Sequence, residues 1–210
     1  HYDKKTVADL YKGQNLFDDY TLQNHNFFHT SYQNVVMQEL GEAALALKLF
    51  QQKTIGEEKW KTNSLMHNND KVMKEVLNWL ALADGELAMP NGNDWSLFLF
   101  VQITSYTTNA CFLNDPDALM LENLAYKNIK ARQTTTSDVS WLLRSDIGAR
   151  RMGVEAHRVM MTWLMHEAIS TADVTPTDWD AFNQRYAAAR IFPCQNIVRA
   201  STADRFTWVV

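Results

Sequence analysis

Between residues 31 and 51 apolar side chains recur at the spacing of one face of an α-helix, which is the strongest constraint on the fold. The apolar positions on that face are Tyr32, Val35, Val36, Leu40, Ala43, Ala44 and Leu47. Ser31 is suited to the N-cap, because its hydroxyl can accept a backbone N–H of the first turn. The segment is therefore predicted to be a long helix that buries one face against other helices.

Most of the remaining chain has the same helical period. Further helices are predicted over residues 70–85, 95–113, 116–132, 138–149, 153–171 and 176–190. Pro116 and Pro176 each stand at a first helical position, where the missing N–H of proline removes no hydrogen bond. Short connections between such helices predict an all-α chain of stacked helical hairpins. Periodicity alone leaves a bundle, a solenoid and an α/α toroid open.

The last residues have a different character. Phe206, Trp208, Val209 and Val210 make an aromatic and β-branched run that favours a strand. We therefore expect a helical domain over residues 1–200 and the start of a β-rich segment over 201–210. The interpretation that follows is a fragment of a larger protein whose next domain is missing, and the alternative is a tail strand.

Composition excludes several classes of protein. The chain carries 24 acidic and 20 basic residues and a net charge of -4, whereas general nucleic-acid binders are usually basic. Two cysteines, Cys111 and Cys194, are too few for a disulfide scaffold or a cysteine zinc site. No apolar run approaches the ~18 residues of a membrane span. We expect neither a nucleic-acid partner nor a membrane span.

The densest polar cluster is the segment Gln-Asn-His-Asn-Phe-Phe-His at residues 23–29, which precedes the long helix. It can be a metal site, since His25 and His29 would share one face of a helix, although no Glu follows the first His. It can equally be a helix cap with core aromatic residues. A third interpretation is proton abstraction from a carbon acid, in which Asn24 donates hydrogen bonds to a carboxylate and His and Tyr transfer protons.

A fourth interpretation is glycoside hydrolysis, which needs two carboxyl groups. The candidates are Asp94, the Asp18-Asp19 pair and Glu155. Each of these carboxylates can also be a helix cap or a solvated charge.

The motif Asn24-His25 before a helix rich in Gln, Leu and Ala resembles the Asn-Asn-His segment of polysaccharide lyases of the alginate lyase and heparinase II/III-like type. A second match is the turn over residues 91–94 followed by a helix with Ser105-Tyr106, which is similar to the segment that carries the catalytic Tyr of those enzymes. This sequence departs from the pattern at Gln23, which replaces the first Asn of the motif, and in a longer gap from Asn24 to Tyr106.

The resemblance implies an (α/α) toroid followed by a β-domain, and β-elimination on a uronate-containing polysaccharide. Asn24 would neutralise the uronate carboxylate. His25 would either act as the base for one epimer or position the sugar. Tyr106 would donate a proton to the leaving oxygen, and it is also an alternative base. The implied substrate-binding residues are His29, Tyr32, Asp94, Trp95 and Arg150.

The implied reaction requires no cofactor and no metal. The implied partners are an anionic polysaccharide and the downstream β-domain, and the implied location is periplasmic or secreted. Two alternatives remain open. One is a glycoside hydrolase on the same toroid that uses Asp94 or another carboxylate, and the other is a non-catalytic carbohydrate-binding helical module.

Overall fold

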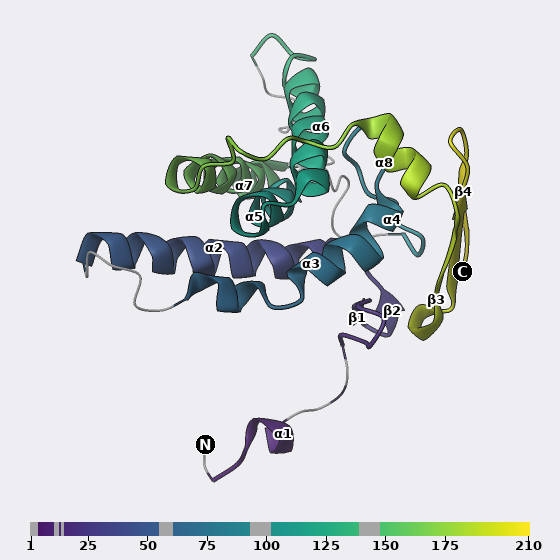
Figure 1. Ribbon diagram of the computed structural model, residues 1–210, viewed down its shortest axis with the longest axis horizontal. Helices are drawn as coiled ribbons and strands as arrows, with labels where there is room; N and C mark the ends of the chain where they lie inside the picture. The colour runs from purple at the N-terminus through teal and green to yellow at the C-terminus, as the bar shows by residue number, and fades with distance from the viewer. Residues whose placement is uncertain (1–3, 11–12, 14, 55–60, 93–101, 139–147) are drawn as a thin grey trace.

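The computed structural model describes residues 4–10, 13, 15–54, 61–92, 102–138 and 148–210 of the 210-residue chain. The described chain is mostly helical and ends in a small antiparallel sheet, as Figure 1 shows. The predicted predominance of helices and the predicted C-terminal strand are therefore confirmed.

Four long helices form the body of the molecule. They are α2 (Thr30–Thr54), α5 (Thr104–Leu113), α6 (Pro116–Gln133) and α7 (Gly148–Ala168). Helix α2 begins one residue before the predicted N-cap, so Ser31 lies inside the helix and that prediction is wrong. Asp115 does cap α6, because its Oδ1 accepts the backbone N–H groups of Asp117 and Ala118 at 2.9 and 3.1 Å.

Shorter helices fill the remaining segments. They are α1 (Val7–Leu10), the 3₁₀ turns η1 (Thr62–Met66) and η5 (Pro193–Gln195), α3 (Asn69–Val72), the π-helical η2 (Met73–Leu77), α4 (Asn78–Leu80) and α8 (Trp179–Arg185). The helix predicted over residues 70–85 stops at Leu80, since Ala81 pairs with Leu87 across a turn in which Gly85 has φ of +79°. The predicted helix over 138–149 falls mainly on residues 139–147, outside the described chain.

The predicted helix over residues 176–190 is wrong at both ends. Asp178, and not the residue before Pro176, caps α8, and the helix ends at Arg185. The following residues turn into β3 (Ala189–Phe192), which pairs with β4 (Ile197–Ser201), and β4 pairs in turn with β5 (Phe206–Val209). The sheet therefore begins inside the range predicted to be helical. Phe192 and Ile197 alternate with exposed neighbours and are fully buried, which fastens the sheet to the main core.

Helix α5 is buried by the helices around it, and Figure 1 shows it between α2, α6 and α7. The Ser105 hydroxyl donates to the Asn34 side chain on α2. The Thr104 hydroxyl donates to the Arg158 carbonyl on α7 at 2.8 Å. The buried residues of α5 are largely Thr, Ser and Asn. Side-chain hydrogen bonds to the neighbouring helices therefore replace part of the apolar packing of a buried helix.

Helices α2 and α5 approach closely where Gly41 faces Thr108. A Cβ atom on Gly41 would overlap the Thr108 side chain, so only glycine permits this helix separation. Gly153 on α7 is a second helical glycine, and nothing lies within 4 Å of a Cβ placed there.

We predict that Gly41→Ala lowers the free energy of unfolding by about 1–3 kcal/mol, because it overpacks the contact between the two helices. Gly153→Ala, the matched control, should raise it by about 0.5–1 kcal/mol through helix propensity alone. Urea unfolding followed by circular dichroism measures both changes. Equal effects of the two substitutions would show that α2 and α5 do not pack at Gly41 as described.

Candidate functional site

The polar segment 23–29 folds into a β-hairpin and does not form a helix. Strands β1 (Gln23–Asn24) and β2 (Phe27–Phe28) pair with Asn24 opposite Phe27. His25 and Asn26 form the two-residue turn with φ of +52° and +66°, a left-handed conformation that mirror-image hairpin turns require. Asn readily adopts this conformation, whereas His does so less often. The turn exposes His25 at the surface.

The hairpin geometry removes the basis of the metal interpretation. That interpretation placed His25 and His29 on one face of a helix, but His25 lies in the turn and His29 comes just before α2. His29 is fully buried, and its Nδ1 lies 2.6 Å from the Ser31 Oγ. Among the described residues, no group of three or more His, Cys, Asp or Glu side chains is arranged so that it could hold a metal ion.

His29 and Tyr32, two of the substrate-binding residues that the resemblance implies, have their rings in contact. The ring centroids lie 4.4 Å apart in an edge-on arrangement. The centroid of the Phe27 ring lies 5.0 Å from that of the His29 ring. His29 is buried, whereas Tyr32 is half-buried in the first turn of α2. The structure thus joins β2 to α2 through three adjacent rings.

The register of the hairpin relates Asn24 to the Phe27 ring. Residues that pair directly across a hairpin have their side chains on the same face, so Asn24 shares a face with Phe27. Asn24, Phe27, His29 and Tyr32 therefore form one continuous set of side chains, and the turn with exposed His25 lies at its end. We call these five residues the hairpin site. It combines an amide donor, an exposed imidazole and a phenol.

Tyr106 is not part of this set. It is fully buried, and its hydroxyl donates to the Gly85 carbonyl at 3.2 Å. Burial, with a smaller contribution from Glu86, raises the pKa of Tyr106 well above its usual value. The preceding residue, Ser105, is the one that contacts α2. The structure therefore directs the Tyr106 hydroxyl into the protein, while His25 faces solvent.

Of the remaining predicted site residues, Arg150 lies within the described part of the chain and Asp94 and Trp95 do not. Arg150 belongs to the first turn of α7. Among the other carboxylates considered for hydrolysis, Asp19 accepts the Thr21 hydroxyl at 2.6 Å, and buried Glu155 pairs with Arg158 at 3.1 Å. These two carboxylates serve as local structural anchors.

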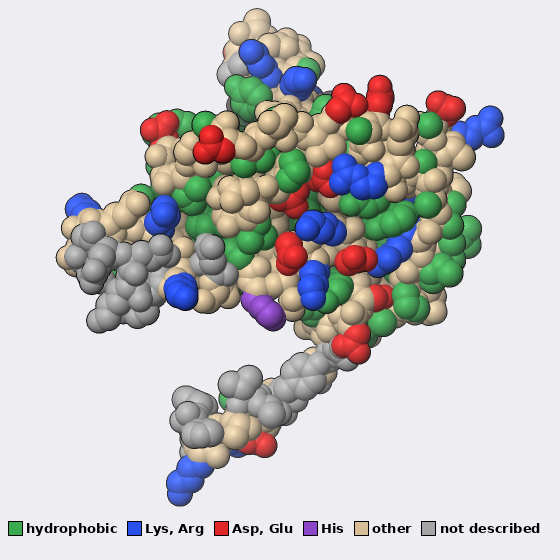
Figure 2. Space-filling model, viewed as in Figure 1, with side chains coloured by type: hydrophobic (Ala, Val, Ile, Leu, Met, Phe, Trp, Pro, Cys, Tyr) green, Lys and Arg blue, Asp and Glu red, His purple; other side chains and the backbone are tan. Residues whose placement is uncertain are grey.

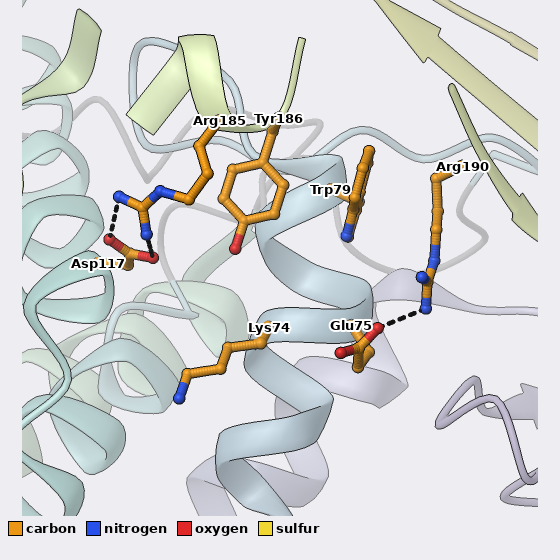
Figure 3. A pocket seen from close by; sticks show the side chains of 7 residues that line it. All are labelled: Lys74, Glu75, Trp79, Asp117, Arg185, Tyr186 and Arg190. Carbon is orange, nitrogen blue, oxygen red and sulfur yellow. Dashed lines mark hydrogen bonds and ion pairs between the residues drawn. The ribbon is translucent and has the colours of Figure 1, made fainter. Parts of the chain in front are cut away.

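A pocket that sequence reasoning missed lies between η2, α4, the start of α6, α8 and β3. Its volume is about 440 Å³. The lining residues are Lys74, Glu75, Trp79, Asp117, Arg185, Tyr186 and Arg190. We call it the basic pocket, and Figure 3 shows its side chains. In Figure 2, Lys and Arg side chains are interleaved with Asp and Glu over the part of the surface that α4 and α8 occupy in Figure 1.

Two ion pairs hold guanidinium groups at opposite ends of the basic pocket. Arg185 binds the buried Asp117 carboxylate with two hydrogen bonds of 2.9 and 3.3 Å. Asp117 also accepts the Asn78 amide and the Thr177 hydroxyl, so its position is fixed from several sides. Arg190 pairs with Glu75 at 2.6 Å. No local sequence signal could reveal this pocket, because its residues come from segments far apart in the chain.

Cys111, Glu122 and His166 form a separate cluster that joins α5, α6 and α7. The His166 Nε2 lies 2.6 Å from the Glu122 Oε1, and its Nδ1 lies 3.8 Å from the Cys111 Sγ. Hydrogen bonds with Cys111 and Glu122 raise the pKa of His166 to about 10, against the opposing effect of burial. His166 is therefore an imidazolium at neutral pH and ties three helices together.

Comparison of the chain with known protein families, curated proteins and solved structures finds no match. Within the described part of the chain, no helix combines the length and apolar character needed to cross a membrane. The chemistry and arrangement of the side chains are therefore the basis for inferring a function.

The raised pKa of His166 predicts a decline of stability at alkaline pH. The folded-state pKa of about 10 exceeds the ordinary value of 6.5, so the contribution is fully present below pH 6.5. It is lost as the pH rises through about 10. Urea unfolding across this range should show a falling free energy of unfolding in the wild type and a flatter profile in His166→Gln. His157→Gln is the matched control, since exposed His157 pairs with Glu42, and it should keep the wild-type slope. A wild-type slope in His166→Gln would contradict the assignment.

Proposed function

We propose that the hairpin site catalyses β-elimination on a uronate-containing polysaccharide, as the resemblance to polysaccharide lyases implies. The observation that carries the proposal is the contiguous arrangement of Asn24, Phe27, His29 and Tyr32 beside exposed His25. An amide donor, an imidazole and a phenol are the groups that this reaction needs around a sugar carboxylate.

Each group has one role in the proposed reaction. The Asn24 amide donates hydrogen bonds to the uronate carboxylate, which stabilises the negative charge that develops when the adjacent carbon loses its proton. His25 removes that proton from C5. The electron pair forms the double bond between C4 and C5, and the bond from C4 to the glycosidic oxygen breaks. The leaving oxygen takes a proton from a phenol, so no oxidant or cofactor is consumed.

The phenol is assigned to Tyr32 and not to Tyr106. Tyr32 is half-buried and contacts the His29 ring, whereas the Tyr106 hydroxyl is buried and bonded to a backbone carbonyl. A proton donor must come within hydrogen-bond reach of the leaving oxygen. Tyr32 meets this requirement with less rearrangement of the protein.

The proposal includes the architecture implied by the resemblance, in which these helices are part of an (α/α) toroid followed by a β-domain. Two features support it. A two-residue connection joins α5 to α6, which pack against each other, and the antiparallel sheet of β3, β4 and β5 follows the helices. An enzyme of this kind acts in the periplasm or as a secreted protein.

The test is ultraviolet absorbance of the conjugated double bond during incubation with alginate, chondroitin, hyaluronan, heparan and glucuronan. We expect one polymer to give the signal. His25→Ala, Asn24→Ala and Tyr32→Phe should each lower its rate by about 100-fold or more, the scale of general acid–base catalysis. His157→Gln and Tyr126→Phe, both at exposed positions, are matched controls and should keep the rate.

Three outcomes would contradict the proposal. New reducing ends without absorbance would indicate hydrolysis and direct attention to Asp94. Polymer binding without turnover would favour a non-catalytic carbohydrate-binding module. Turnover that survives all three hairpin substitutions would place the reaction elsewhere in the chain.

Tyr106→Phe separates the two candidate phenols. We predict that it lowers the free energy of unfolding by about 1 kcal/mol, the usual contribution of one hydrogen bond, and keeps at least half of the elimination rate. Urea unfolding and the absorbance assay measure the two effects. A folded Tyr106→Phe protein without elimination activity would return the proton-donor role to Tyr106.

A further inference from the structure

The basic pocket has no role in the proposed elimination. Its lining has more cations than carboxylates and more free hydrogen-bond donors than acceptors. Its lining has three cations, Lys74, Arg185 and Arg190, against two carboxylates, Glu75 and Asp117. Both carboxylates are already engaged by the two arginines. Within the described residues Lys74 has no ion-pair partner, and it is exposed at the edge of the pocket.

Donors outnumber acceptors among the uncharged groups as well. The Tyr186 oxygen accepts the Asn78 amide at 2.9 Å, which leaves the Tyr186 proton to donate. Burial raises the pKa of Tyr186, so that proton is retained at neutral pH. Figure 3 shows the indole nitrogen of Trp79 between Tyr186 and Arg190, above Glu75. The Nε of Arg190 is buried and has no hydrogen-bond partner in the described structure.

Contacts within the protein already hold the side chains of Arg185 and Arg190 in place. Arg185 is held by two hydrogen bonds to a buried carboxylate and lies over the Phe182 and Tyr186 rings. Arg190 lies over the Trp79 ring, with its guanidinium carbon 5.6 Å from the ring centroid. A donor array fixed in this way binds an anion with little loss of side-chain entropy.

We propose that the basic pocket binds a carboxylated sugar, whose carboxylate lies against Lys74 and whose ring oxygen and hydroxyl groups accept from Trp79, Tyr186 and Arg190. Three features select this ligand. The net charge of the lining is +1, which matches one carboxylate. The volume of about 440 Å³ suits a sugar ring rather than an inorganic anion. The free groups of the pocket are mainly donors, and a sugar acid is rich in acceptor oxygens.

The proposal does not rest on the elimination reaction, and its test is kept separate from it. The probe is the methyl glycoside of glucuronic acid, which has no sugar at O4 and therefore cannot be cleaved by elimination there. Isothermal titration calorimetry of the full chain should detect its binding. The methyl glycoside of neutral glucose should bind at least about tenfold more weakly, because it lacks the group that pairs with Lys74.

The decisive variant is Lys74→Gln, since Lys74 is exposed and makes no ion pair within the described residues; its charge acts on Asp115 without a direct contact. We expect it to weaken binding of the glucuronide about tenfold without changing the circular dichroism spectrum. Lys127→Gln is the matched control, because Lys127 is an exposed lysine on α6 outside the pocket, and it should bind like the wild type. Trp79→Phe should also weaken binding by removing one donor.

The proposal is overturned if the wild type does not bind the glucuronide, or if Lys74→Gln binds it as tightly as Lys127→Gln does. Tighter binding of inorganic phosphate than of the glucuronide would overturn the assignment to a sugar acid. Binding that depends on Lys74 supports the pocket whether or not the chain cleaves a polymer.

Discussion

The close contact between α2 and α5 is the constraint on which the rest of the molecule depends. Gly41 lets the backbone of α2 come against Thr108, and Ser105 bonds to Asn34 across the same interface. Once α5 is fixed there, its other sides bury Tyr106 in the main core and bring Cys111 to His166 of α7. Small and polar side chains set these distances, which bulky apolar residues would enlarge.

The segment around the hairpin meets the C-terminal sheet on this core, and these contacts position both candidate sites. The Phe28 and Phe192 rings stack with centroids 6.2 Å apart, which joins the hairpin to β3. Asp19 accepts the backbone N–H of Cys194, and the Gln195 amide donates to the Thr21 hydroxyl. The N-terminal hairpin is thus anchored to the C-terminal sheet, while Arg190 of β3 reaches the basic pocket. Neither site could keep its geometry without the small sheet.

The sequence predicted the parts of the fold that local periodicity governs. The long helices and the strand near Phe206 follow from side chains close together in the chain. It failed where long-range pairing overrides local pattern, as at the start of β3, where Ala189 and Arg190 were predicted to end a helix. The basic pocket was missed for the same reason, since Asp117 and Arg185 meet only through tertiary folding.

The candidate site shows why only some residues of a sequence motif are brought together by the fold. Asn24 and His25 stay close in the structure because they are consecutive residues, one at the end of β1 and the other in the hairpin turn. Tyr106 had to come from another helix, and successive residues on a helix point about 100° apart. Ser105 points toward α2, so Tyr106 points in a different direction, and its hydroxyl donates to the Gly85 carbonyl. Tyr32, in the first turn of α2, is the tyrosine whose ring contacts His29 beside the hairpin.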